Sequence, residues 1–232
     1  MASIQVLYED NHILVVVKPV NMPTQEDESR DPDLLSVLKA DLKLRHGKPG
    51  NVYLGLVHRL DRPVGGVMVF AKTSKAASRL SETVRSRSLD KIYTAVIHGK
   101  LKHPQGTLID WLLKDTKTNT VHVVSEGSAG AKQAILDYQL LGSKDGLSLV
   151  RIKLHTGRSH QIRVQLAAAG SPLYGDQRYG SSVNRPGQQL ALWSTGLAFE
   201  HPTLKEELRF RSLPPEQHPW QLWPELIRNF PE

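Results

Sequence analysis

Residues 58–66 read His-Arg-Leu-Asp-Arg-Pro-Val-Gly-Gly and lead directly into the apolar run Val-Met-Val-Phe-Ala at 67–71. That run is typical of a buried strand. Paired glycines in front of such a strand let another backbone or a ligand approach closely. Asp61 therefore stands between two arginines in a tight loop, either as a functional carboxylate or as a surface partner of Arg59 or Arg62.

A second polar segment, residues 157–166, reads Gly-Arg-Ser-His-Gln-Ile-Arg-Val-Gln-Leu. We expect a helix from about Ser159 to Ala169, with Ile162 and Leu166 facing the core and Arg163 at the edge of that face. Polar donors crowd its first turn, where a helix N-terminus already attracts anions. The alternative interpretation is a helix rim with solvated charges.

The rest of the chain alternates short apolar runs with a few amphipathic stretches. Together they predict an α+β fold on a mixed, largely antiparallel central sheet flanked by helices and loops, with an active-site cleft across the sheet. No long Gly/Ser/Pro linker interrupts the sequence, so residues 1–232 are expected to form one catalytic domain. The expected strands are 13–17, 67–71, 91–98, 190–199 and 208–211, a hairpin joins 135–141 to 147–154 through the loop 143–146, and further helices cover 34–46 and 74–87, the latter capped by Ser74.

Composition narrows the possible functions. The chain has 232 residues, no cysteine and a net charge of +7. The absence of cysteine excludes disulfides, thiolate metal sites and cysteine nucleophiles, and it fits a cytoplasmic protein. No apolar run approaches the roughly 20 residues needed to span a membrane, and no secretion signal is recognised.

Basic residues are concentrated in two stretches. Residues 51–100 carry nine Lys/Arg against three Asp/Glu, and residues 151–200 carry six against two. A clustered positive charge is the electrostatic footprint of a polyanion-binding protein, most often one that binds nucleic acid, although a solvated basic surface is the simpler alternative.

Together the two polar segments resemble the RluA-like family of RNA pseudouridine synthases. The family's first motif reads His-Arg-Leu-Asp, two variable residues and Thr-Ser-Gly. Its second reads Gly-Arg-Thr/Ser-His-Gln-Ile/Leu-Arg-Val-His, followed by His-Pro-Leu-x-Gly-Asp-x-x-Tyr-Gly, which here is Ser-Pro-Leu-Tyr-Gly-Asp-Gln-Arg-Tyr-Gly at 171–180. The likeness extends from about Tyr8 to Ser212. Val64-Gly65 replaces the family's Thr-Ser, and Gln165 and Ser171 replace its histidines.

The resemblance implies a role for four residues. Asp61 matches the catalytic aspartate, and Arg163 matches the arginine that pairs with that carboxylate. Tyr93 matches the tyrosine that stacks on the target base, and Arg59 matches an arginine that fills the space left by the flipped nucleotide. We assign Arg62, Arg158 and His160 to phosphate or pocket contacts.

The implied reaction breaks the N1–C1′ bond of uridine, turns the base and joins C5 to C1′, so it needs neither a cofactor nor a metal. It needs a carboxylate that stays ionised, which an arginine within about 4–6 Å favours by holding the pKa of the aspartate down. The sequence leaves open whether the carboxylate attacks the sugar, attacks C6 of the base or assists elimination to a glycal. The expected partner is RNA, either ribosomal or transfer RNA. We expect the enzyme to be a monomer without a membrane partner and without the N-terminal S4 domain that is common in the family.

Three other functions are compatible with parts of the sequence. An RNA-binding protein without activity would tolerate the loss of Asp61. A hydrolase with paired carboxylates, such as a nucleosidase, would need a second acid near Asp61, and the next acids along the chain are Glu82 and Asp90. A metal enzyme built on His58, His155 and His160 would need a ligand spacing that these residues do not have.

Overall fold

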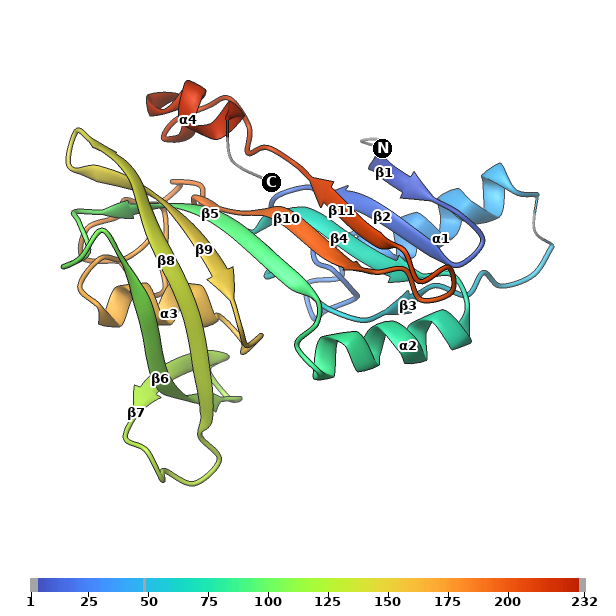
Figure 1. The fold of residues 1–232 in the computed structure, drawn as a ribbon, viewed down its shortest axis with the longest axis horizontal. Helices are drawn as coiled ribbons and strands as arrows, with labels where there is room; N and C mark the ends of the chain where they lie inside the picture. The colour runs from blue at the N-terminus through green and yellow to red at the C-terminus, as the bar shows by residue number, and fades with distance from the viewer. Residues whose placement is uncertain (1–3, 48, 230–232) are drawn as a thin grey trace. The chain divides into compact units, whose positions relative to one another are not determined.

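The computed structural model describes residues 4–47 and 49–229. The chain forms two compact units, which are described separately: Met1–Asp90 with Ser194–Ser212, and Lys91–Trp193 with Leu213–Glu232. Both units combine helices and strands (Figure 1), so the α+β class is confirmed. The assignment of residues 1–232 to a single domain stays a prediction.

The first unit contains a sheet whose strands run in the order β1-β2-β4-β10, with β11 on β10 and β3 on β4. The pairs β1–β2, β2–β4, β3–β4 and β10–β11 are antiparallel. The bounds are β1 Gln5–Glu9, β2 Ile13–Lys18, β3 Gly55–Leu56, β4 Gly65–Ala71, β10 Leu192–Glu200 and β11 Glu207–Arg211.

Two apolar strands form the centre of this sheet. In the ladder Ile13 pairs with Ala71 and Val17 with Val67. Because side chains alternate along a strand, each strand presents apolar residues to both faces. Every residue of β4 is buried, and β2 is almost as deeply buried. The two buried strands expected here are therefore confirmed.

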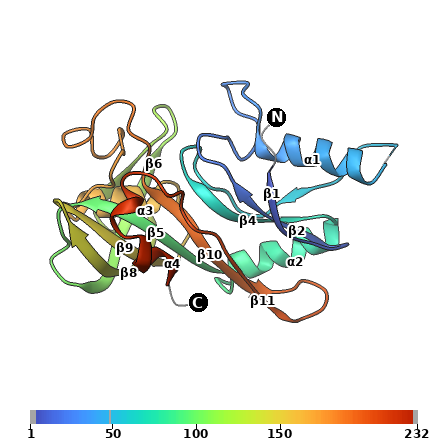
Figure 2. The same cartoon turned by 90° about the horizontal axis from the view of Figure 1, so that it is seen from above.

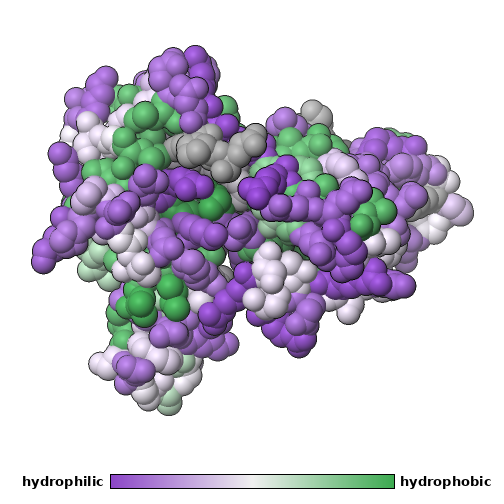
Figure 3. All heavy atoms as spheres, in the orientation of Figure 1, coloured by the Kyte–Doolittle hydropathy of each residue, from purple (hydrophilic) through white to green (hydrophobic). Residues whose placement is uncertain are grey.

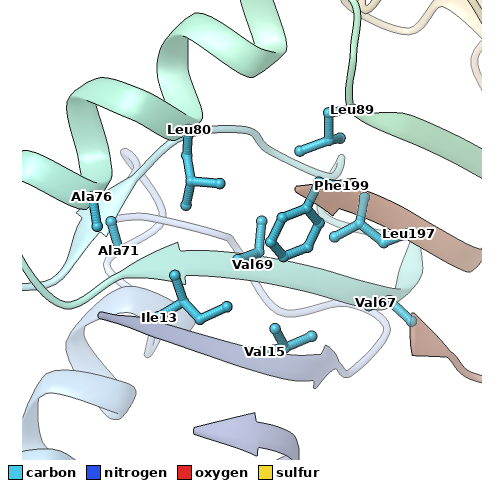
Figure 4. Packing of buried hydrophobic residues seen from close by; sticks show 10 residues of the cluster. All are labelled: Ile13, Val15, Val67, Val69, Ala71, Ala76, Leu80, Leu89, Leu197 and Phe199. Carbon is cyan, nitrogen blue, oxygen red and sulfur yellow. The ribbon is translucent and has the colours of Figure 1, made fainter. Parts of the chain in front are cut away.

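Each face of this sheet carries one helix. Helices α1 (Leu34–Arg45) and α2 (Ser74–Arg85) lie on opposite sides of β1, β2 and β4 (Figure 2). On the α2 side, Ala76 and Leu80 pack over Ile13 and Val69 (Figure 4). The apolar periodicity predicted both helices, although α2 begins one residue earlier than a Ser74 cap requires. The cap is Thr73, whose side chain accepts a hydrogen bond from the backbone N–H of Ala76.

The second unit contains an antiparallel sheet in the order β5-β9-β8-β6-β7. Helix α3 packs against β6 and β7. One apolar cluster, Leu112, Val121, Ala134 and Val164, takes a residue from each of β6, β7, β8 and α3. The bounds are β5 Asp90–His98, β6 Gln105–Asp115, β7 Thr120–Val124, β8 Lys132–Lys144, β9 Leu147–Leu154 and α3 Gln161–Ala168, followed later by the 3-10 turn Trp220–Leu222 and α4 Pro224–Arg228.

The predicted hairpin is confirmed, but its loop is shorter than expected. β8 continues to Lys144, so only Asp145 and Gly146 form the turn, and both have positive φ angles, of 53° and 75°. Two central residues with positive φ match the tight turns that suit the twist of paired strands. The expected loop 143–146 was therefore too long.

Helix α3 also differs from the expectation at its start. It begins at Gln161 rather than Ser159, because His160 has a φ of 51° and cannot continue a right-handed helix.

The face shown in Figure 3 is mostly hydrophilic, with the apolar side chains largely buried. Within residues 4–47 and 49–229, no helix is both long enough and apolar enough to cross a bilayer.

Candidate active site

The Asp61 loop joins β3 to β4 and is anchored on both sides of the carboxylate. Leu60 and Val64 are buried, whereas Asp61 between them is partly exposed. The N–H of Val64 donates to the carbonyl of Asp61 at 3.0 Å and closes a turn. An aspartate between two buried anchors is held in place while its side chain stays accessible.

Gly66 allows the strand that follows this loop to lie against another backbone segment. Its φ is +119°, and a Cβ added there would come within 2.6 Å of the backbone nitrogen of Ser194. Only glycine tolerates both the angle and the approach. The paired glycines predicted a close approach, and at Gly66 this is confirmed, with backbone as the partner.

A buried lysine holds the Asp61 loop from within the protein. The Lys18 side chain is 0% exposed, and its Nζ donates to the carbonyls of Pro19 at 2.9 Å, Arg62 at 3.0 Å and Val64 at 2.8 Å. Burial lowers the pKa of Lys18 to about 7, the charge of Asp61 acts to raise it, and Arg62 lowers it further. The buried amine of Lys18 thus ties the backbone of the loop to the end of β2 through three carbonyls.

Two further side chains fix the backbone of the same loop. The hydroxyl of Thr24 donates to the carbonyl of Leu60 at 2.9 Å. The Nε2 atom of His58 accepts a hydrogen bond from the backbone N–H of Val69 at 3.1 Å, which ties the start of the loop to β4. His58 therefore serves as a loop anchor.

The two arginines beside Asp61 differ in their surroundings. Arg59 is exposed. Arg62 forms an ion pair with Asp31, lies 3.9 Å from a carboxylate oxygen of Asp27 and donates to the hydroxyl of Ser29 at 2.9 Å. An RNA phosphate would therefore have to compete with the acidic loop 27–31 for Arg62. The RNA-binding roles of both arginines stay predictions.

In the second unit, Arg163 is more deeply buried than a position at the edge of α3 suggests. It is 7% exposed, and its Nε and Nη2 atoms donate to the two oxygens of Asp176 at 2.8 and 2.9 Å. Its guanidinium carbon lies 5.2 Å from the ring centroid of Tyr179. Asp61 and Arg163 belong to different units, so their pairing stays a prediction.

Tyr93 lies in β5 and is 6% exposed, opposite Ile152 of β9. Its role in stacking on a base stays a prediction. Near the start of α3, Nε of Arg158 donates to the carbonyl of Gln133 at 2.9 Å, and Nδ1 of His160 lies 2.7 Å from the hydroxyl of Tyr179. Both side chains thus contact protein groups, and their assignment to RNA also stays a prediction.

The rival functions gain no support from the described residues. Glu82 is paired with Arg85 on α2, and His155 with Asp137 at 2.6 Å. Across residues 4–47 and 49–229 there is no group of three or more His, Asp or Glu side chains placed to hold a metal ion.

Sequence reasoning missed three residues, one that holds the Asp61 loop in the first unit and two that contact Arg163 in the second. Lys18 directly follows the apolar run 13–17, and no pattern in the sequence indicated a role for it. Asp176 and Tyr179 lie in the Gly-Asp-x-x-Tyr-Gly segment, which was recognised without a role for either residue. The available signal was that both residues belong to a family motif. Their contacts with distant residues cannot be predicted from spacing alone.

Comparison with known proteins identifies the family. Residues 12–168 match the family model described as RNA pseudouridylate synthase. The chain is 35% identical over 206 residues to the uncharacterized RNA pseudouridine synthase YhcT of Bacillus subtilis, covering 88% of this chain and 66% of that protein. It is 32% identical to the ribosomal large subunit pseudouridine synthase D of Pseudomonas aeruginosa, covering 95% of this chain and 71% of that protein.

A solved structure agrees with this result. Human RNA pseudouridylate synthase domain containing 4 superposes with a TM-score of 0.77 at 25% identity, covering 91% of this chain and 88% of that one. This likeness confirms the expected pseudouridine synthase fold. The chain spans about two thirds of the length of the curated relatives it matches. The chain belongs to the RNA pseudouridylate synthase family, whose members are isomerases that act on RNA.

Proposed function

We propose that this chain converts uridine to pseudouridine in RNA and that the carboxylate of Asp61 is its catalytic group. The observation that carries the proposal is the build of the Asp61 loop in a member of this family. Buried residues flank the aspartate, and the ammonium of Lys18 is held by three carbonyls on or beside the same loop. Such a loop fixes the carboxylate in position, as a nucleophile requires.

Arg163 is the proposed partner of Asp61 in the reaction. A guanidinium next to the carboxylate would keep it ionised in a site closed by bound RNA. All three routes considered for the chemistry, attack on C1′, attack on C6 and elimination to a glycal, use the same carboxylate. The proposal therefore does not depend on the route.

The target base must leave its stack before the glycosidic bond can be reached, at a cost of a few kcal/mol. We propose that Arg59 fills the vacated space and that Tyr93 stacks on the uracil. Stacking on an aromatic ring contributes about 1–3 kcal/mol per base. Arg62, Arg158 and His160 would contact phosphates or line the site. The roles of Arg59 and Tyr93 follow from the family resemblance, whereas those of Arg62, Arg158 and His160 are our own assignment.

Ribosomal RNA is the proposed substrate, and transfer RNA is the alternative. Two of the similar proteins are named ribosomal large subunit pseudouridine synthases, D of Pseudomonas aeruginosa and C of Buchnera aphidicola, which favours the first. We further propose that the enzyme is of the RluA-like type and acts as a cytoplasmic monomer. The clustered positive charge at 51–100 and 151–200 supports binding to RNA.

The test is a map of pseudouridine in total RNA from cells with and without this gene, followed by complementation. We expect at least one pseudouridine to disappear with the gene, to return with the wild-type chain and to stay absent with Asp61→Asn. The affected position identifies the substrate. Identical maps in all four strains would refute the proposed function.

A further inference from the structure

Asp176 holds the Arg163 side chain through two hydrogen bonds, whereas an ion pair requires only one contact. Nε and Nη2 of the guanidinium donate to different oxygens of the carboxylate, at 2.8 and 2.9 Å. The Arg163 and Asp176 side chains are 8% and 0% exposed. Two parallel hydrogen bonds fix the plane of a guanidinium, which one contact cannot do.

The carboxylate of Asp176 is itself held by the backbone. Its Oδ1 atom accepts the N–H groups of Arg178 at 2.9 Å and Tyr179 at 3.1 Å, in addition to Arg163. Burial acts to raise the pKa of Asp176, but the hydrogen bond and charge of Arg163 and these backbone donors outweigh it and lower the pKa. Asp176 is therefore a fixed anion that cannot follow Arg163 if the arginine moves.

The segment that carries Asp176 has little regular structure, yet it is tightly tied. Gly175 has a φ of +77°, and a Cβ there would meet the backbone of Gln189. The Asn184 amide nitrogen donates to the carbonyls of Leu173 at 2.9 Å and Gly180 at 2.9 Å, and its oxygen accepts the N–H of Gly175 at 2.6 Å. These contacts hold the segment around a single buried carboxylate.

Tyr179 restrains Arg163 from a second direction. The ring centroid lies 5.2 Å from the guanidinium carbon, a cation–π distance. The hydroxyl accepts the N–H of Val121 at 2.9 Å and lies 2.7 Å from Nδ1 of His160. Because both ends of the tyrosine are engaged, its ring cannot swing away from the arginine.

We propose that Asp176 and Tyr179 are positioning residues, which hold the guanidinium of Arg163 in the one plane that serves the reaction. This inference rests on the proposed function, in which Arg163 pairs with Asp61. A purely stabilising role explains the arrangement less well, because well-packed apolar residues often stabilise a core as much as a buried ion pair does. A fixed direction for the charge is something that only the ion pair provides.

The assay is single-turnover release of tritium from RNA labelled at C5 of uracil, with RNA binding and unfolding by denaturant measured on the same samples. Asp176→Asn keeps the shape of the side chain but removes its charge. Tyr179→Leu removes the ring and is the second variant if Asp176→Asn does not fold. Arg163→Gln tests the proposed function itself. Asp137→Asn, which removes another ion-paired carboxylate of the same unit, is the matched control.

We expect Asp176→Asn to slow the reaction roughly 100-fold, the effect of a misplaced reacting group, with RNA affinity unchanged within about 3-fold. Tyr179→Leu should slow it by roughly 5- to 10-fold. In an Arg163→Gln background, neither change should cause a further loss beyond about 3-fold, because residues that act through one another are not additive. The control should match the wild type.

The pH dependence separates positioning from a simple effect of charge. If Asp176 matters only as a charge, its removal leaves the positive charge of Arg163 uncompensated. The acidic limb of the pH–rate profile then moves to lower pH. If Asp176 positions Arg163, its removal moves that limb to higher pH. Full activity in folded Asp176→Asn or Tyr179→Leu, while Arg163→Gln is inactive, would overturn the inference and leave the proposed function standing. Full activity in Arg163→Gln would instead remove Arg163 from the proposed function, and this inference with it.

Discussion

Lys18 offers a direct physical test of how the Asp61 loop is held. The substitution Lys18→Met keeps the length and volume of the side chain but removes the donor to three carbonyls. Each buried acceptor left without a donor costs about 1–3 kcal/mol. Removal of a buried charge acts in the opposite direction, so the net change in the free energy of unfolding depends on pH.

The pH dependence follows from the pKa of about 7 in the folded protein, compared with 10.5 for an ordinary lysine. Between these values the unfolded chain binds more protons than the folded protein, so this group makes the wild type more stable as pH rises. The slope approaches about 1.4 kcal/mol per pH unit. Lys18→Met lacks this contribution, and its destabilisation should be about 2 kcal/mol larger at pH 9 than at pH 7.

The measurement is denaturant unfolding of the wild type and Lys18→Met at pH 6, 7 and 9. Lys75→Met, an exposed lysine on α2, is the control and should change stability by less than about 0.5 kcal/mol at every pH. Little change is expected between pH 6 and 7. A destabilisation by Lys18→Met that is the same at pH 7 and pH 9 would refute the argument from the buried amine.

Three further substitutions, the first with a control, test the packing and the charges of the first unit. Gly66→Ala should destabilise the protein by more than about 4 kcal/mol in denaturant unfolding, because its Cβ would meet the backbone of Ser194. The control Gly47→Ala, at a positive φ in open space, should cost about 1 kcal/mol. Equal effects would contradict the close approach. Burial acts to raise the pKa of Glu9, but hydrogen bonds from three basic neighbours lower it to about 2, so its stabilisation is present above pH 4.5 and is lost as the pH falls towards 2. Glu9→Gln should therefore cost about 2–3 kcal/mol at pH 7 and clearly less at pH 3, and a pH-independent cost would argue against the network. Leu80→Ala should cost about 2–5 kcal/mol through the cavity it leaves in the cluster of Figure 4, and a loss below 1 kcal/mol would show that α2 repacks.

The parts of the fold that sequence could predict are those with a strong hydrophobic pattern. The apolar runs at 13–17 and 67–71 predicted strands, and the spacing of Leu34, Leu38 and Leu42 predicted a helix. Strand β6 was not predicted, because most of its side chains are exposed or only partly buried and it has no continuous apolar run. Tertiary pairing, with β7 on one side and β8 on the other, decides such a segment.

The functional residues also differ in whether a local motif predicts them or only the fold brings their partners together. The motif around Asp61 was recognisable because its chemistry is carried by neighbouring residues. Lys18 was not, because its role depends on carbonyls from two loops that meet only in the fold. The role of Asp176 likewise becomes visible only in the structure, where Arg163 donates two hydrogen bonds to it. Contacts of this kind leave no periodic signal in a single sequence.

The most direct test of the central claim is single-turnover release of tritium from uracil C5 by purified wild type and Asp61→Asn, on an RNA carrying the uridine found by mapping. Joining C5 to C1′ requires loss of the C5 hydrogen, so the signal reports the isomerisation itself. We predict a loss of at least about 10⁴-fold, the range found when an essential catalytic group is removed, with folding and RNA affinity retained. Turnover by a folded Asp61→Asn enzyme within about 10-fold of the wild type, less than general acid–base or covalent assistance provides, would contradict the account.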